Sequence, residues 1–284
     1  MLDPLVLYAV GTSVGVFFGM HDVVIRGSRS NMDSRHMLLA SLISGYPVVF
    51  LFSLVFWGFS AISIESIILY IIAGLVNFNV GRASLYVAIR TIGASGASIM
   101  LTLSIVIGIA LGTGVGERVS PTQALGALLI LIAAIMVAWR GEIKKDPRGI
   151  IAGLIASFGL ALAIFLSRLG NINGGDPFAG ALIAYTSSIA FEAFLLRNTE
   201  IRGIFSRNNT AVYLAGVLAS LGQVARYVAL VQLGASIVTP LQNIRPVVAT
   251  TLTRVFYSRT AENPGLRGYI AAVVAFTGVF LMAI

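Results

Sequence analysis

The chain has 284 residues, of which 57% are hydrophobic and only 11% are charged, whereas a soluble domain carries about 25% charged residues. So few charges could not cover a soluble protein of this size, and the composition instead favours a membrane protein whose apolar exterior is solvated by lipid. The net charge is +8, but the basic residues lie between apolar runs and form no single patch, so nucleic acid is not an expected partner. The chain has no cysteine and only two histidines, His21 and His36. Disulfides, thiol catalysis and cysteine-ligated or histidine-rich metal sites are therefore excluded, and no cofactor is expected.

Apolar runs between polar breaks predict an all-α membrane protein with ten transmembrane helices, because one span needs about 20 mostly apolar residues. The first run has no basic segment before it, so we interpret it as a span and not as a signal peptide. Backbone polar groups inside a bilayer must be satisfied internally, and runs this long and continuous favour helices over a barrel. In chain order the predicted helices are 5–26, 37–59, 66–90, 94–113, 120–140, 149–168, 177–197, 211–231, 236–257 and 265–284.

An internal repeat divides the predicted helices into two groups of five. Residues 81–95 recur as 222–236, a shift of 141 residues at which 7 of 15 positions are identical. Nearby shifts also align Asp33 with Asp176. Chance similarity of apolar helices is the alternative, but the match includes a tyrosine and a Gly-Ala-Ser junction. Because five is odd, the second group must enter the membrane from the opposite side, which is a transporter architecture with a central substrate site.

The repeat also sets the expected domain boundaries. We predict a first five-helix repeat at 1–140, a charged linker at 141–148 and a second five-helix repeat at 149–284. The two repeats are expected to be related by a rotation of about 180° around an axis in the membrane plane.

Several short motifs resemble the drug/metabolite transporter superfamily in its ten-helix EamA-like form, over nearly the whole chain. They are the helix junction 86–95 with its copy at 227–236, the Gly-Glu-Arg-Val segment 116–119, and the Arg-Pro-Val segment 245–247. The resemblance implies secondary transport of metabolites, amino acids or drug-like solutes, often outward. The first-half counterpart of Pro246 is Ile105, so equal roles for the two halves stay open.

Basic residues are distributed unequally between the predicted loops, which bears on orientation. The side shared with the termini holds two, Arg118 and Arg168. The opposite side holds Arg26, Arg29, Arg35, Arg90, Arg140, Lys144, Lys145, Arg148, Arg197, Arg202, Arg207 and Arg259. Since Lys and Arg mark cytoplasmic loops, this bias places both termini outside the cytoplasm. The resemblance favours cytoplasmic termini instead, and we follow the charges.

The best candidate for a substrate-binding residue is Arg245. It lies about ten residues into the predicted ninth helix, roughly 15 Å from its start, so the side chain cannot easily reach either membrane surface. Pro246 follows directly and is expected to free backbone carbonyls within the helix. Gln242 and Asn243, one turn earlier, would extend this polar spot. The alternative is a structural arginine that balances an internal carboxylate.

A second candidate is a polar face that occurs on the predicted third and eighth helices. Spacings of three and four residues place Asn79, Arg82 and Tyr86 on one face of the third helix. The repeat shift relates this face to a similar one on the eighth helix, which carries Gln223, Arg226 and Tyr227. We predict that both faces line a shared substrate cavity, and the alternative is hydrogen bonding between helices.

Three acidic residues and one histidine near helix ends have further candidate roles. Asp22 could balance an arginine or carry a coupling proton, and His21 titrates near neutral pH, although a helix end in the headgroups is an alternative for both. Glu192 is expected to form an interfacial ion pair near Arg197, and Glu117 is expected to cap a helix or act in gating.

These observations favour a secondary transporter, an exporter, that works by alternating access. In-membrane arginines outnumber carboxylates, which favours a small polar or anionic metabolite such as an amino acid or organic acid. The expected partners are this small molecule, the lipid bilayer of the cell membrane and protons as coupling ions, with the protein a monomer or a homodimer. The alternatives are a membrane-embedded enzyme acting on a lipid-like substrate and a non-transporting membrane scaffold.

Overall fold

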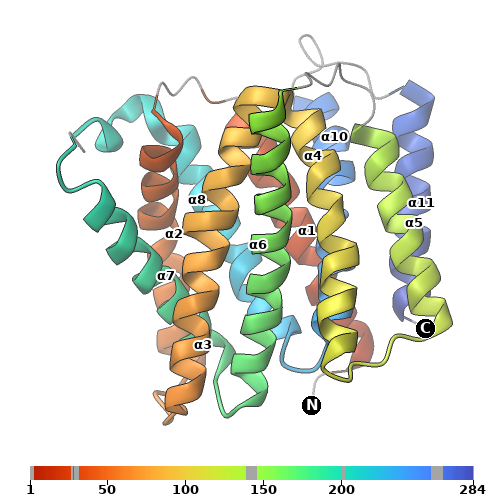
Figure 1. The fold of residues 1–284 in the computed structure, drawn as a ribbon, viewed down its shortest axis with the longest axis horizontal. Coiled ribbons are helices and arrows are strands. Elements are labelled where there is room, and N and C mark those ends of the chain that lie inside the picture. Colours follow the sequence, from red (N-terminus) through yellow and green to blue (C-terminus); the bar gives the residue numbers. More distant parts are fainter. Residues whose placement is uncertain are drawn as a thin grey trace.

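The computed structural model describes residues 3–26, 28, 32–138, 146–199, 202–256 and 265–283. All regular elements in these ranges are helices, and they form one bundle in which both termini lie at the same end (Figure 1). The prediction of an all-helical protein is therefore confirmed for the described part of the chain.

Among the described residues, the first half of the chain holds five α-helices and one π-helix. They are α1 (Pro4–Arg26), α2 (Ser34–Phe56), α3 (Ile64–Gly74), the π-helix η1 (Leu75–Arg82), α4 (Ala83–Gly114) and α5 (Pro121–Ala138). The second half holds six α-helices and two short 3₁₀-helices. They are α6 (Pro147–Ile172), α7 (Pro177–Leu195), η2 (Arg202–Phe205), η3 (Arg207–Asn209), α8 (Thr210–Ala229), α9 (Ala235–Gln242), α10 (Arg245–Phe256) and α11 (Gly265–Ala283).

The predicted break between the third and fourth helices is not a loop. Helical structure is continuous from Ile64 to Gly114, through α3, η1 and α4. In Figure 1 the chain ascends through α3 and returns through the second half of α4, so the change of direction occurs within helical residues. A helix keeps its own backbone groups hydrogen-bonded, and this explains why a turn inside a membrane protein can remain helical.

The predicted ninth helix, in contrast, is broken where a continuous helix was expected. α9 ends at Gln242 and α10 begins at Arg245. At the break, the backbone N–H of Asn243 donates to the carbonyl of Pro240 (2.9 Å) and that of Ile244 to the carbonyl of Leu241 (3.4 Å), which is tight turn geometry. The expectation that Pro246 interrupts a helix interior is therefore wrong. This proline lies in the first turn of α10, where its missing N–H is tolerated.

The second helix of each half begins in the same way. Asp33 caps α2 by accepting hydrogen bonds from the backbone of residues 35 and 36, and Asp176 caps α7 through the N–H groups of Phe178 and Ala179. Burial raises the pKa of Asp33, but hydrogen bonds from the backbone and imidazole of His36 outweigh it and hold this pKa below its ordinary value. The aligned aspartates thus have one structural role.

Packing between the two halves is reciprocal. α1 packs on α8, α9 and α10, while α6, the first helix of the second half, packs on α3, η1 and α4. The two last helices, α5 and α11, pack on each other, as do α2 and α7. Exchanging the two halves therefore converts the contacts of α1 into those of α6 and leaves the α5–α11 and α2–α7 contacts in place.

Glycines on α1 allow its close approach to the broken helix. A β-carbon added at Gly15 would lie 2.9 Å from the carbonyl oxygen of Gln242, and one added at Gly19 would lie 2.8 Å from Cβ of Val248. Both distances are too short for a real contact. Gly15 and Gly19, four residues apart on α1, therefore serve helix packing.

Buried polar side chains occur inside the bundle, while many large apolar side chains lie exposed on its outer surface. Exposed side chains include Phe50 at 44%, Phe158 at 52% and Phe276 at 57%, whereas Gln223 and Arg226 are almost fully buried. Among the described residues, six helices are long and apolar enough to cross a membrane. The distribution suits a protein that is solvated by lipid.

Candidate functional site

A polar cavity lies where residues from both halves of the chain meet. Its volume is about 30 Å³, and since a water molecule needs roughly 10–15 Å³ measured in this way, it has room for about two waters. Its lining comes from α1, η1, α4, α6, α8 and the broken helix α9–α10. The lining residues are Phe18, Asn77, Arg82, Leu85, Leu101, Ser104, Leu160, Arg226, Gln242, Asn243, Arg245 and Pro246.

Arg245, at the N-terminus of α10, is held by a carboxylate from α1. Its Nε donates to Oδ2 of Asp22 and its Nη2 to Oδ1, both at 2.5 Å. The same carboxylate lies 2.9 Å from Nδ1 of His21. The His21 ring is buried, and its Nε2 has no hydrogen-bond partner. This geometry matches the alternative interpretation of the sequence, an arginine balanced by an internal carboxylate, and it brings the two proton-coupling candidates to the same cluster.

Two further arginines face the cavity with no carboxylate beside them. Arg82, the last residue of η1, is 6% exposed and lies over the ring of Phe78 at 4.8 Å. Arg226 of α8 is 2% exposed, and its Nη1 donates to Oδ1 of Asn77 at 3.4 Å. Nη1 of Arg82 and Nε of Arg226 have no hydrogen-bond partner. Within the described part of the chain, neither guanidinium forms an ion pair.

Amide side chains at the helix break complete the polar lining. Nδ2 of Asn243 donates to Oγ of Ser104 on α4 (3.1 Å) and to the carbonyl of Thr239 (2.8 Å), so this side chain ties α9 to the first half of the chain. Oε1 of Gln242 and Nδ2 of Asn77 have no partner. The cavity lining therefore contains a free acceptor at the helix break, on Gln242, and a free donor on η1, on Asn77.

Four of the residues predicted to bind substrate are not part of the cavity lining. Asn79 donates to Oε2 of Glu192 at 2.7 Å. Tyr86 and Tyr227 are buried in one hydrophobic cluster, so both point into the protein. Gln223 is also buried, and neither of its amide atoms has a partner. Arg82, Arg226, Gln242, Asn243 and Arg245 are the predicted residues that the structure brings together.

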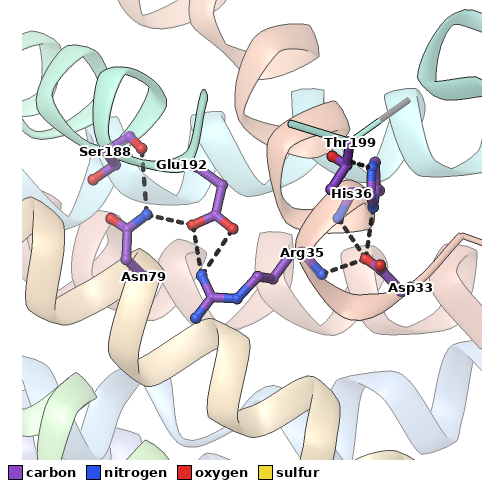
Figure 2. Close-up of polar contacts among 7 residues, drawn as sticks. All are labelled: Asp33, Arg35, His36, Asn79, Ser188, Glu192 and Thr199. Carbon is purple, nitrogen blue, oxygen red and sulfur yellow. Dashed lines mark hydrogen bonds and ion pairs between the residues drawn. The ribbon is translucent and has the colours of Figure 1, made fainter. Parts of the chain in front are cut away.

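A separate polar cluster forms between α2, η1 and α7 (Figure 2). Glu192 is fully buried and accepts two hydrogen bonds from Nη1 of Arg35, at 3.0 and 3.2 Å. The expectation that Glu192 pairs near Arg197 is therefore wrong, because the guanidinium of Arg197 lies over the ring of Phe194 at 4.3 Å. The true partners are 157 residues apart, and no sequence pattern signals such a pairing.

Glu117 connects the two halves at the end of the bundle where the termini lie. One carboxylate oxygen accepts from the backbone N–H of Ala235 (2.9 Å), and the other accepts from the N–H (2.9 Å) and Oγ (2.7 Å) of Ser236. Nε of Arg168 lies 3.9 Å from the same carboxylate. These bonds confirm the predicted capping role: Glu117 caps the N-terminus of α9.

Comparison with known proteins gives two kinds of similarity. Residues 6–139 and residues 147–284 each match the family model of the EamA-like transporter family, so the matches cover nearly the whole chain. No curated protein matches the chain. A protein of known crystal structure is similar over 98% of this chain and 98% of its own, with 14% sequence identity and a TM-score of 0.78. Similarity at this identity shows a shared fold.

Proposed function

Because the chain belongs to the EamA-like transporter family, we propose that it is a secondary transporter of a small polar or anionic metabolite, such as an amino acid or organic acid. Transport is by alternating access and outward across the cell membrane. The observation that supports this most directly is the polar cavity at the break between α9 and α10, which side chains from both halves line. Broken helices at the interface of two repeats are a common way to build a transport site.

The proposed architecture is ten transmembrane helices in two inverted repeats, at 1–140 and 149–284, with 141–148 as the linker. Two observations support it besides the two family matches. The packing between halves is reciprocal, and α2 runs toward the end where the termini lie, while α7 runs away from it (Figure 1). Five helices per repeat produce this reversal. From the charge bias, both termini lie outside the cytoplasm.

The cavity has to open for transport. At about 30 Å³ it is too small for a metabolite, so the site must widen before a metabolite can bind. Glu117 and the glycine-mediated contact of α1 with the broken helix hold the halves together. An alternating-access cycle would loosen such contacts on one side at a time.

We propose that protons drive export and that His21, in preference to Asp22, carries the coupling proton. The carboxylate of Asp22 already accepts from Arg245 and lies against His21. Nε2 of His21, in contrast, has no partner, so a proton can be added there without breaking an existing hydrogen bond.

The absence of cysteine allows a direct test of alternating access. A single cysteine at Ser104→Cys places a thiol on the cavity wall, and Ser53→Cys, at a buried serine that bonds to Phe178, is the matched control. Each variant is treated with a membrane-impermeant maleimide in right-side-out and in inside-out vesicles. We expect Ser104→Cys to be labelled from both sides and the control from neither.

The same experiment separates the alternatives. A scaffold or a membrane-embedded enzyme open to one face would label from one side or from neither. Labelling of Ser104→Cys from a single side, unchanged by any solute, would contradict alternating access.

A further inference from the structure

We infer that the ligand subsite for anionic groups is the pair Arg82 and Arg226, and that the ligand is a small organic dianion. This inference rests on the proposed transport function and specifies its substrate class. It also replaces Arg245 as the main anion-binding residue. The observation behind it is the distribution of charge and of unpaired donors in the cavity.

The charge count in the cavity is unbalanced. Arg82, Arg226 and Arg245 line it, and Asp22 is the carboxylate that pairs with one of them within the described residues. With His21 neutral, two positive charges remain without a counter-charge. Arginine stays protonated in proteins, so burial cannot remove these charges by neutralisation. A buried cation without a partner is costly, and an anionic ligand with two charges would remove this cost.

The available donors show where the anion would bind. Nη1 of Arg82 and Nε of Arg226 are buried and have no hydrogen-bond partner, and Nδ2 of Asn77, whose Oδ1 accepts from Arg226, is also free. Guanidinium groups bind carboxylates and phosphates through parallel N–H donors. The three free donors therefore form a ready-made site for oxygen atoms that carry negative charge.

Arg245 is a poor candidate for the same role. Its Nε and Nη2, which form one donor fork, are already occupied by both oxygens of Asp22. A ligand would have to displace a bidentate carboxylate and leave it without its arginine. Arg82 and Arg226 require no such exchange.

The same features disfavour other ligand classes. A cation or the ammonium group of a zwitterion would need an anionic partner, but Asp22 is held by Arg245 and His21. A monoanion would leave one guanidinium unpaired. Apolar side chains of Leu85, Leu101 and Leu160 form the rest of the wall, which suits a short carbon skeleton between or beside the charged groups.

The test is a thermal-stability titration of the purified full-length protein in detergent at low ionic strength, because salt screens such sites. The probes are succinate and glycerol phosphate as dianions, lactate as a monoanion, succinamide as a neutral analogue and putrescine as a dication. We expect one or both dianions to raise the melting temperature and the other probes to have little effect. Succinate and glycerol phosphate distinguish a dicarboxylate from a phosphate monoester.

Variants of the two arginines identify the subsite. Arg82→Gln and Arg226→Gln should each weaken dianion binding about tenfold or more, since each removes hydrogen bonds between charged groups. Without ligand, neither should lower the melting temperature, because neither arginine has an ion-pair partner to strand among the residues that the structure describes. Arg197→Gln, which removes an arginine from an exposed stack on Phe194, is the matched control and should leave binding unchanged.

Besides the absence of any dianion effect, two results would overturn the inference. One is stabilisation by lactate or putrescine and not by the dianions. The other is dianion binding that is unchanged in both Gln variants. A failure to see any dianion effect also overturns it, and the two-sided labelling of Ser104→Cys then decides separately whether the protein is a transporter.

Discussion

The ion pair between Arg245 and Asp22 gives the sharpest test of how the cavity is stabilised. Replacing Arg245 with alanine leaves Asp22 without its partner. The two groups join through two hydrogen bonds of 2.5 Å, and their side chains are 16% and 27% exposed. Breaking a buried pair costs about 3–5 kcal/mol. Because Asp22 is partly exposed and also contacts His21, we expect the lower end, about 3 kcal/mol of lost stability.

Two further variants separate the contributions to this loss. Arg245→Lys keeps the positive charge but loses the planar fork, so the expected loss is about 1.5 kcal/mol, near the value of one hydrogen bond to a charged group. The double variant Asp22→Asn with Arg245→Gln removes both charges, and most of the stability should return. The free energy of unfolding is measured by denaturant titration in detergent micelles, and the single variants Asp22→Asn and Arg245→Gln complete a double-mutant cycle.

The outcome that would refute the reasoning is equally specific. If Arg245→Ala unfolds at the same denaturant concentration as the parent protein, the pair does not stabilise the fold. If the double variant is less stable than Arg245→Ala alone, the two groups contribute independently. In either case Arg245 would be free to bind a ligand, and the assignment of the anion subsite to the other two arginines would lose its basis.

Three other predictions concern the orientation expected from the charge bias and two contacts of buried or capping carboxylates. A reporter fused after Ile284 should report the exterior and one inserted in 141–148 the cytoplasm; the opposite pattern would reverse the proposed orientation but not the fold. Glu117→Ala should cost about 1–2 kcal/mol of unfolding free energy through loss of the cap on α9, and an unchanged unfolding midpoint would contradict that role. Arg35→Ala should lower stability by about 3 kcal/mol, because it strands the fully buried Glu192, and adding Glu192→Gln should recover part of the loss; no recovery would show that the two residues are not coupled.

The sequence predicted the helices well because their apolar runs are long and the breaks between them contain charges and turn-forming residues. Helix α6, for example, was expected at 149–168 and extends over Pro147–Ile172. The break after Gln242 was missed because a proline in an apolar run is compatible with either a kink or a new helix start. Only tertiary contacts, such as the bond from Asn243 to Ser104, select the second possibility.

The candidate site was harder to predict than the helices, because its geometry also depends on tertiary contacts. Periodicity places Asn79, Arg82 and Tyr86 on one face of a regular α-helix, but the chain forms the π-helix η1 over Leu75–Arg82, which changes the angular spacing. Arg82 and Asn77 thus reach the cavity, and Asn79 instead reaches Glu192. The partners of buried charges lie on distant helices, and local sequence patterns do not contain that information.

The cap on α9 has a consequence for the order in which the protein assembles. With eight residues, Ala235–Gln242 is too short to be stable as an isolated helix. Its first N–H groups are satisfied by Glu117, which is 118 residues earlier in the chain than Ala235. Synthesis proceeds from the N-terminus, so the carboxylate has already been made when α9 leaves the ribosome. The first half of the chain thus serves as a template on which the broken helix of the second half can form.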